Sequence, residues 1–305
     1  MLPAGWVRTE EGTHQTVTMR ILVGLAAGIA ALPTIASAQD AAPPATAEAI
    51  AQELGGDSVT VGVGVGYLTD YEGSDDYRWT PVPGAIGSVG GINFQVLGNR
   101  ASADLIPNQS GSTWDFQLGP IGVINFMRSD RSSIDDPRVK ALGERDTAIE
   151  LGGYAGIGKT GIITSPYDRL SVSVSYRHDV TKVHRSGIWQ PTITYFTPLS
   201  TKAAVAVLAS AERVETKYIR TYYDISPDEA AVSGLPAYRG RGGWKSWTVG
   251  ALGTYSLSGH LLKGWKIVGG ATYRKLINDM ADSPIVSVAG SRHQWIGAVG
   301  LGYTF

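Results

Sequence analysis

The chain has 305 residues, no cysteine, and 26 Lys plus Arg against 27 Asp plus Glu. The lack of cysteine excludes a disulfide scaffold, a cysteine-ligated zinc site and a thiol nucleophile. A net charge of −1 argues against nucleic-acid binding, which needs a basic surface. Few charged residues (17%) combined with 39 Gly, 14 Tyr and 8 Trp favour an all-β protein whose apolar side chains alternate with small ones.

Residues 19–38 (MRILVGLAAGIAALPTIASA) have the pattern of an export signal. Arg20 supplies a positive start, residues 21–32 form an apolar run, and small residues precede the predicted cleavage site between Ala38 and Gln39. The apolar run is shorter than the roughly 20 residues that a membrane-spanning helix needs. The segment is therefore predicted to be a cleaved signal peptide.

Three further boundaries follow from this signal. Residues 1–18 are polar and acidic where a signal would begin, so Met19 is the better start and 1–18 is predicted to be a misannotated extension. Residues 39–56 are rich in Ala and Pro and are predicted to be a flexible leader before a barrel domain at 57–305. Because no later apolar run reaches half a membrane span, a closed barrel is the remaining way to cross lipid.

The last segment, 293–305 (HQWIGAVGLGYTF), alternates large apolar side chains with small ones. Ten steps of about 3.3 Å, tilted by about 40°, span roughly 25 Å, the height of a lipid-facing band. Segments 247–257 and 265–274 repeat the pattern, with Trp and Tyr eight positions apart on one face. A soluble β-sandwich would not require aromatic residues at both strand ends. The predicted membrane-girdle aromatics are Trp247, Tyr255, Trp265, Tyr273, Trp295, Tyr303 and Phe305.

The alternation predicts a transmembrane antiparallel β-barrel of about twelve strands, with ten and fourteen as alternatives. The expected strands are 58–68, 85–97, 101–106, 113–127, 147–158, 169–179, 188–196, 202–212, 215–222, 244–257, 264–275 and 293–305. With both barrel ends in the periplasm, 223–243 and 276–292 become long extracellular loops, and 258–263 a short periplasmic turn. The charged segment 128–146 then falls on the periplasmic side. Either the strand count slips there or the barrel has a periplasmic protrusion.

Four stretches of the chain carry a family resemblance. They are Gly62–Asp76 with Tyr71-Glu72-Gly73-Ser74, Tyr222–Pro227 with Ser233–Tyr238, Tyr273–Leu276 with Asp282-Ser283-Pro284-Ile285-Val286, and Gly300–Phe305. With these in order, the chain resembles the MipA/OmpV family of outer-membrane proteins. One departure is Asp224, where the family more often has glycine.

The resemblance implies location in the outer membrane of a Gram-negative bacterium and a non-enzymatic role in peptidoglycan synthesis. MipA, the MltA-interacting protein, is described as a scaffold joining a lytic transglycosylase to a penicillin-binding protein, and OmpV-type members as surface proteins, in some cases adhesins. Outer-membrane lipid and lipopolysaccharide are further expected partners. The terminal Phe305 resembles the sorting signal read by the barrel-assembly machinery, and no nucleic-acid partner is expected.

The residues predict no catalytic, cofactor or metal site. His293 is the one histidine expected at the outer rim, and a Ser–His–Asp arrangement with Asp282 and Ser283 is conceivable there. His178 is expected to face outward, with His184 and His260 in periplasmic turns. No nucleophile elbow or zinc-protease motif occurs.

Two sets of charged residues and one glycine pattern are further candidates for a binding site. The carboxylates of Asp70, Glu72, Asp75 and Asp76 could bind Ca²⁺ or form a solvated loop beside Arg78, and Arg239, Arg241 and Lys245 could contact anionic lipid headgroups. Gly62, Gly64 and Gly66 do not match the dinucleotide fingerprint and are expected to face a crowded lumen.

Four functions are weighed from these features. A scaffold would use 128–146 as its docking surface. A solute pore would be weakly selective, because Lys266 and Arg274 face inward with Glu150 and Glu212. An adhesin would use 223–243 and 276–292, and a lipid-modifying enzyme would use His293.

Overall fold

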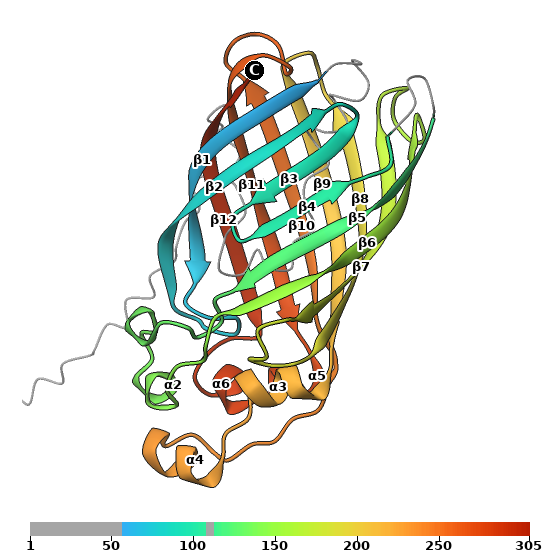
Figure 1. Cartoon of the computed structure of the whole chain (residues 1–305). Coiled ribbons are helices and arrows are strands. Elements are labelled where there is room, and N and C mark those ends of the chain that lie inside the picture. Colours follow the sequence, from blue (N-terminus) through green and yellow to red (C-terminus); the bar gives the residue numbers. More distant parts are fainter. Residues whose placement is uncertain (1–56, 108–112) are drawn as a thin grey trace, which may run out of the picture.

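The barrel is closed, and its strands are antiparallel. A computed structural model describes residues 57–107 and 113–305 (Figure 1). Each strand pairs with its neighbours in the chain, and the last pairs with the first. The strands are β1 Ser58–Thr69, β2 Tyr77–Val89, β3 Ile92–Leu97, β4 Arg100–Asp104, β5 Trp114–Asn125, β6 Ala148–Thr160, β7 Arg169–Asp179, β8 Gly187–Pro198, β9 Ala203–Val214, β10 Gly243–Ser256, β11 Gly264–Leu276 and β12 His293–Thr304. The predicted β-barrel of about twelve strands is confirmed.

The period-two pattern sorts side chains between the outer wall and the lumen. On β12, Trp295 and Leu301 are exposed on the outside, while Ile296 and Ala298 are buried inside. The predicted girdle residues lie on the outer face, with Tyr255 and Trp265 about half exposed and Phe305 the most exposed. His178 also faces outward. This wall offers lipid the apolar surface that a membrane barrel requires.

Glycines bring β1 unusually close to β12. A methyl group at Gly64 would lie 2.5 Å from the carbonyl oxygen of Val299, and one at Gly62 would lie 2.7 Å from that of Leu301. Both glycines face the lumen, as expected. The pairing of β1 with β12, which closes the barrel, therefore requires glycine at these two positions.

The strand count is correct, but two of the predicted strands are wrong. Residues 85–97 are not one strand, because Gly90 and Gly91 both have positive φ (59° and 79°) and make a tight turn between β2 and β3. Residues 215–222 are not a strand either. They contain the helix α3 (Thr216–Tyr222), since Tyr218, Ile219 and Tyr222 are spaced to share one buried helix face.

One error omits a strand and the other adds one, so the total number of strands stays at twelve. Between the two errors, however, each connecting loop was assigned to the wrong end of the barrel. Segment 128–146 connects β5 to β6 and lies at the same end as 223–243 and 276–292, not opposite them. The prediction that it lies opposite these two loops is therefore wrong, because the order of the predicted strands slipped between 85 and 222. The β7–β8 turn, which holds His184, moves to the same end.

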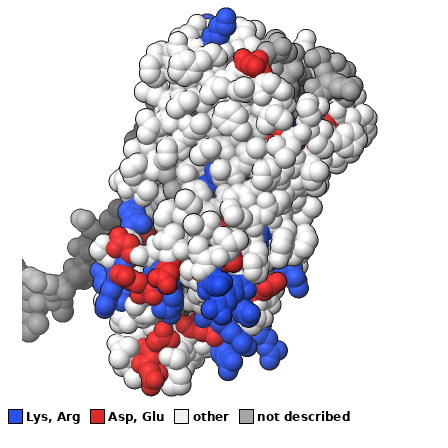
Figure 2. Space-filling model, viewed as in Figure 1, with Lys and Arg blue, Asp and Glu red and all other residues white. Residues whose placement is uncertain are grey.

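The helices gather at one end of the barrel, which we call the helical end (Figure 1). The other end, which holds Ser58 and Phe305, is the terminal end. The helices are η1 Arg131–Ser133, α2 Pro137–Ala141, α3, α4 Pro227–Ser233, α5 Asn278–Asp282 and α6 Pro284–Ser287. None of those in the described ranges has the length and hydropathy of a membrane span. Charged side chains concentrate around the helical end, whereas the visible wall is almost free of them (Figure 2).

The predicted extension (1–18), signal peptide (19–38), cleavage site at Ala38 and Gln39, and leader (39–56) all lie outside the described residues. They stay predictions.

Candidate functional site: a lid over a buried charge network

The loops of the helical end form an apolar lid across the mouth of the barrel. Four loops contribute side chains to it: β1–β2, β5–β6, β9–β10 and β11–β12. We call the set the lid cluster. Its buried members are Tyr71, Met127, Ile134, Val139, Leu142, Ile188, Val214, Tyr218, Ile219, Tyr222, Tyr223, Ile225, Leu235, Leu276, Met280, Ala281, Ile285, Val286 and Ala289. Burying each large side chain contributes about 1.5–3 kcal/mol, so the lid is a packed layer rather than a set of loose loops.

Two of the family-like stretches meet inside this lid. The Tyr71 hydroxyl donates to the carbonyl oxygen of Ala289 at 2.7 Å, and burial raises the pKa of this phenol well above its usual range, so it stays a neutral donor. Gly73 has φ +108°, and a methyl group there would lie 2.7 Å from the side chain of Val286. The carbonyl oxygen of Gly73 also accepts the Ser291 N–H at 2.8 Å. The motif glycine thus fits both a backbone turn and a contact across the lid.

A third family-like stretch joins them. The Tyr223 hydroxyl donates to the carbonyl oxygen of Glu72 at 2.9 Å, and the Ser283 hydroxyl donates to that of Tyr223 at 2.7 Å. Residues near 72, 223 and 283 are therefore tied into one chain of hydrogen bonds. Arg128 ties in the β5–β6 loop, because its guanidinium donates to the carbonyl oxygens of Tyr222 (2.9 Å) and Gly143 (3.1 Å). Burial lowers the pKa of Arg128 to about 10, and the group stays charged at neutral pH.

A network of buried charges crosses the lumen directly beneath the lid. Lys245 Nζ lies 2.8 Å from Glu72 Oε2 and 2.7 Å from Glu212 Oε2. Arg274 contacts Glu72 Oε1 at 2.8 Å. Arg177 binds Glu150 at 2.5 Å and also pairs with Glu212. The members of this charge network, all at most 3% exposed, are Glu72, Glu150, Arg177, Glu212, Lys245 and Arg274.

The network joins strands on several sides of the barrel to one loop. Glu150, Arg177, Glu212 and Arg274 project inward from β6, β7, β9 and β11, and Glu72 comes down from the β1–β2 loop. Moving such charges out of water costs several kcal/mol each, so a buried network persists only when its members stay paired. The inward orientation predicted for Glu150, Glu212, Lys266 and Arg274 is confirmed, since all four are buried.

Lys245 was expected at the lipid headgroups, and this expectation is wrong. Strict alternation from Trp247 would point Lys245 outward. A register irregularity between Trp244 and Ser246 inverts the alternation, so Lys245 turns into the lumen and is 2% exposed. A bulge of this kind re-aims one side chain and leaves no reliable mark in the sequence. Arg239 and Arg241 are exposed in the β9–β10 loop.

His184 is also placed differently from its prediction. Instead of lying in a solvated periplasmic turn, it is fully buried, with Nε2 3.2 Å from Glu150 Oε1 and its ring against Tyr218. The turn folds inward because the Asp179 carboxylate accepts the backbone N–H groups of His184 (2.7 Å) and Arg185 (2.9 Å). His260 lies in the turn at the terminal end, as predicted.

The four acidic residues of the β1–β2 loop do not form one site. Glu72 belongs to the charge network, Asp70 accepts the Asp135 N–H at 3.0 Å, and Asp75 is exposed. The expectation of a solvated loop paired to Arg78 is therefore wrong for Glu72. In the described part of the chain, no three His, Cys, Asp or Glu residues gather as metal ligands.

The three residues considered for a Ser–His–Asp site are engaged elsewhere. His293 Nδ1 lies 2.5 Å from the Tyr273 hydroxyl on the outer face. Asp282 is exposed and 3.9 Å from Arg292. Ser283 is fully buried and bonded to the Tyr223 carbonyl. The geometry brings no two of them into a hydrogen bond.

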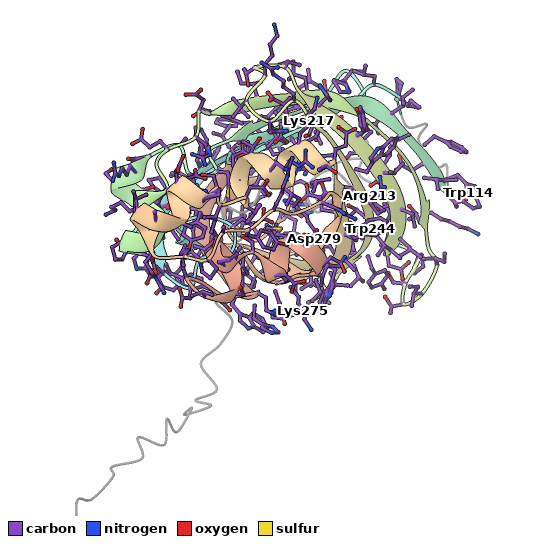
Figure 3. All side chains as sticks on the ribbon, turned by 90° about the horizontal axis from the view of Figure 1, so that it is seen from below. Trp114, Arg213, Lys217, Trp244, Lys275 and Asp279 are labelled. Carbon is purple, nitrogen blue, oxygen red and sulfur yellow. The ribbon has the colours of Figure 1, made fainter. Side chains whose placement is uncertain are left out.

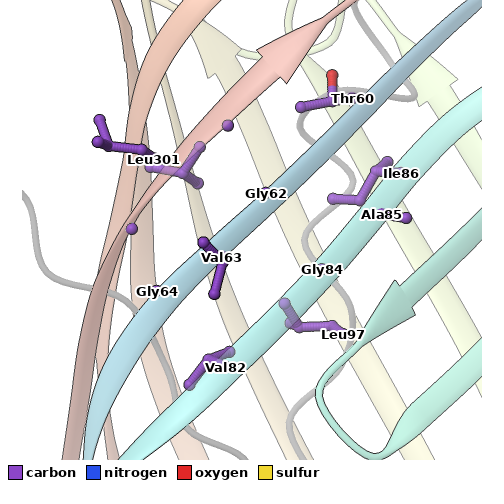
Figure 4. Close-up of a pocket in the computed structure, with 13 residues that line it drawn as sticks. Thr60, Gly62, Val63, Gly64, Val82, Gly84, Ala85, Ile86, Leu97 and Leu301 are labelled. Atoms are coloured by element: carbon purple, nitrogen blue, oxygen red, sulfur yellow. The ribbon is translucent and has the colours of Figure 1, made fainter.

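Toward the terminal end the lumen holds an apolar group beside further buried charges, among them the Arg169–Asp115 ion pair and the ammonium group of Lys266. Phe196, Leu208, Leu252 and Leu261 pack together there. A small cavity of about 70 Å³ lies against β1, β2 and β12, lined mostly by glycine and aliphatic residues (Figure 4). The lumen beyond the charge network therefore mixes apolar packing with further buried charged groups.

Comparison with known proteins places the chain in a family and finds several similar chains. The family model described as MltA-interacting protein MipA matches residues 61–305. Outer membrane protein Omp26La of Vibrio anguillarum is 25% identical over 218 residues, which cover 70% of this chain and 77% of that protein. Among solved structures, the COG4313 outer membrane channel from Pseudomonas putida F1 is 11% identical, with a TM-score of 0.42, and covers 88% of this chain and 98% of that one. The CymD monoaromatic hydrocarbon channel is 11% identical, with a TM-score of 0.38 and coverages of 91% and 94%.

The closed strand wall with an apolar exterior defines an outer-membrane β-barrel, and the outer membrane is its location. Within that class, the chain belongs to the MipA family.

Proposed function

We propose that this protein is a non-enzymatic scaffold that holds a murein-degrading lytic transglycosylase, and through it a penicillin-binding protein, at the outer membrane. The lid cluster over the charge network carries the proposal, because a mouth filled by packed side chains favours a role played by the surfaces of the barrel. The family description, MltA-interacting protein, supports this choice of partner.

Membrane orientation follows from loop length. Bacterial barrels have short periplasmic turns and long extracellular loops. The helical end carries the long loops, so we place it outside the cell and the terminal end in the periplasm. This orientation removes 128–146 as a periplasmic docking surface, because that segment lies at the helical end.

The β6–β7 turn, residues 161–168, is the better docking candidate at the terminal end. Ile163 and Tyr167 are about 60% exposed (62% and 60%). The turn is nevertheless well ordered, because the Asp168 carboxylate accepts the backbone N–H groups of Ile162 (2.7 Å), Ile163 (3.0 Å) and Thr164. Rigid exposed apolar side chains suit a protein contact, since little ordering entropy is lost on binding.

Co-purification with a lytic transglycosylase tests the scaffold. The full barrel should retain the hydrolase, and Ile163→Asp should weaken retention by about tenfold or more. Val232→Asp is the matched control, because Val232 is 69% exposed at the opposite end. Equal loss of hydrolase retention in both variants would overturn the proposal that residues 161–168 are the docking surface. Failure of the unmodified barrel to retain the hydrolase would overturn the scaffold function itself.

Surface recognition is a second candidate, favoured by one cleft at the helical end. The cleft has a volume of about 610 Å³, and its lining includes Arg220, Arg239 and Tyr238. Both arginines are exposed and make no side-chain hydrogen bond or ion pair with the described residues. Free guanidinium groups beside an aromatic ring suit an acidic saccharide. Cells displaying Arg220→Gln/Arg239→Gln barrels should then lose binding to acidic glycans, and unchanged binding would exclude this cleft.

A further inference from the structure

Two cations stand on the outer wall at the helical end, each next to aromatic side chains. Arg213 on β9 lies between Trp189 on β8 and Trp244 on β10, its register partners on either side. Lys275 on β11 lies between Trp247 on β10 and His293 on β12. Figure 3 looks onto this end, with Arg213, Trp244 and Lys275 around the edge of the helices. The row extends over five adjacent strands.

Neither cation has an ionic partner among the described residues. The side chains of Arg213 and Lys275 make no hydrogen bond or ion pair there. Lys217, on α3 just beyond Arg213, is a third exposed cation. Two carboxylates lie near this row. The Asp279 carboxylate accepts the Arg241 backbone N–H at 2.7 Å and keeps its charge, and Glu215 is exposed. The three cations Arg213, Lys217 and Lys275 therefore outnumber the two carboxylates, and the row keeps a net positive charge.

The aromatic residues fix the level of this row in the membrane. Trp244 is 44% exposed and Trp189 is 45% exposed, and the Trp247 ring contacts the Tyr273 ring at 5.4 Å. Trp and Tyr concentrate where lipid chains meet headgroups. Arg213 and Lys275 consequently sit at headgroup depth, where a phosphate is the complementary group.

We propose that this row, Trp189–Arg213–Trp244 with Trp247–Lys275–His293, binds the bisphosphorylated disaccharide headgroup of lipid A. One strand lies between the two cations, and their register partners on it, Trp244 and Trp247, are three residues apart. Two strand spacings combined with about three residues along the strand separate the two positions by roughly 13 Å. One phospholipid phosphate cannot reach both. A disaccharide with a phosphate on each sugar presents two anionic groups, and the tryptophan faces can pack against the sugar rings. This assignment rests on the orientation proposed above: with the helical end outside the cell, the row lies in the leaflet where lipid A resides.

Binding of three lipids to the refolded, full barrel in detergent tests this proposal. The probes are bisphosphoryl lipid A, monophosphoryl lipid A and phosphatidylglycerol, with the dissociation constant measured for each. We expect the bisphosphoryl form to bind at least about tenfold more tightly than the other two. Arg213→Gln/Lys275→Gln should abolish that preference.

Lys202→Gln/Lys263→Gln is the matched control, because it removes the same charge from exposed lysines at the terminal end. It should leave the preference within twofold. Equal binding of all three lipids, or an equal loss in both double variants, would show general electrostatic attraction and overturn the lipid A site. Circular dichroism and gel mobility of the folded barrel confirm that each variant is folded.

Discussion

Arg274 Nη1 lies 2.8 Å from Glu72 Oε1, although 202 positions separate the two residues in the chain. The same carboxylate binds Lys245 through its other oxygen at 2.8 Å. One loop residue is thus the counter-charge for two strand residues across the lumen. Tyr71 of the same β1–β2 loop belongs to the lid cluster. The ion pairs of Glu72 with Lys245 and Arg274 therefore link the lid to the strands of the barrel wall.

Removing the Glu72 carboxylate should loosen the lid. In Glu72→Ala, two buried cations lose one counter-charge, and breaking buried pairs of this kind costs about 3–5 kcal/mol. We expect faster proteolysis of the loops at the helical end and a lower unfolding temperature. Asp75→Ala, which changes an exposed acid in the same loop, should behave like the unmodified barrel. Equal resistance of both variants to protease would disprove the coupling.

Gly73 should tolerate a methyl group less well than another loop glycine. Both Gly73 and Gly143 have positive φ, which costs an alanine about 1–2 kcal/mol. Only Gly73 adds a clash, with Val286 at 2.7 Å, whereas a methyl at Gly143 meets nothing within 4 Å. In denaturant unfolding, the free energy of unfolding of Gly73→Ala should therefore be well below that of Gly143→Ala. The reverse order would show that the motif glycine does not serve lid packing.

The unmodified barrel should be electrically silent in planar bilayers. The lid cluster and charge network fill the mouth, so no lasting ohmic openings are expected. Replacing residues 217–241 with a short Gly-Ser linker removes α4 and most of α3 and should produce openings of low conductance. Adding Glu72→Ala should enlarge them. Stable openings in the unmodified barrel would contradict this prediction and indicate that conducting solutes is its main function.

Asp168 should hold the β6–β7 turn in a pH-dependent way. Burial raises the pKa of Asp168, but hydrogen bonds from Thr164, Ile162 and the Tyr195 hydroxyl outweigh it and hold the pKa below its usual range. The unfolded value is about 3.9, so the stabilisation is complete above that pH and is lost as pH falls through the lower folded value.

Hydrogen exchange of the amides of 162–165 measures this effect. At neutral pH, Asp168→Ala should speed their exchange about tenfold, since an acceptor worth roughly 1–2 kcal/mol is lost. After correction for intrinsic rates, the difference should shrink as the pH falls below about 4. A difference that stays constant with pH would mean that the carboxylate charge is not what orders the turn.

Particular residues show where sequence patterns succeed and fail. Alternation correctly placed the outward Trp295 and the inward Glu150, because a strand in a one-layer wall has only two faces. The same rule misplaced Lys245, where a bulge shifts the register by one. It also turned 215–222 into a strand, although Tyr218 and Tyr222 are one helical turn apart.

The candidate site was recognised only in fragments. Tyr71, Glu72, Gly73 and Ser283 were singled out by resemblance, without any indication that they touch. Their contacts lie between loops distant in the chain: 60 positions separate Ser283 from Tyr223, and 151 separate Tyr223 from Glu72. No local pattern records such pairings, and the burial of His184 depends on where a whole turn folds.

By itself the sequence determined the class of the protein: an alternating, glycine-rich, cysteine-free chain can satisfy its backbone in lipid only by closing a barrel. Tertiary structure alone decided what fills that barrel. The lid cluster and the charge network are built from loops and strands distant in the chain, and only the closed wall brings those loops over one mouth, where their side chains are in contact.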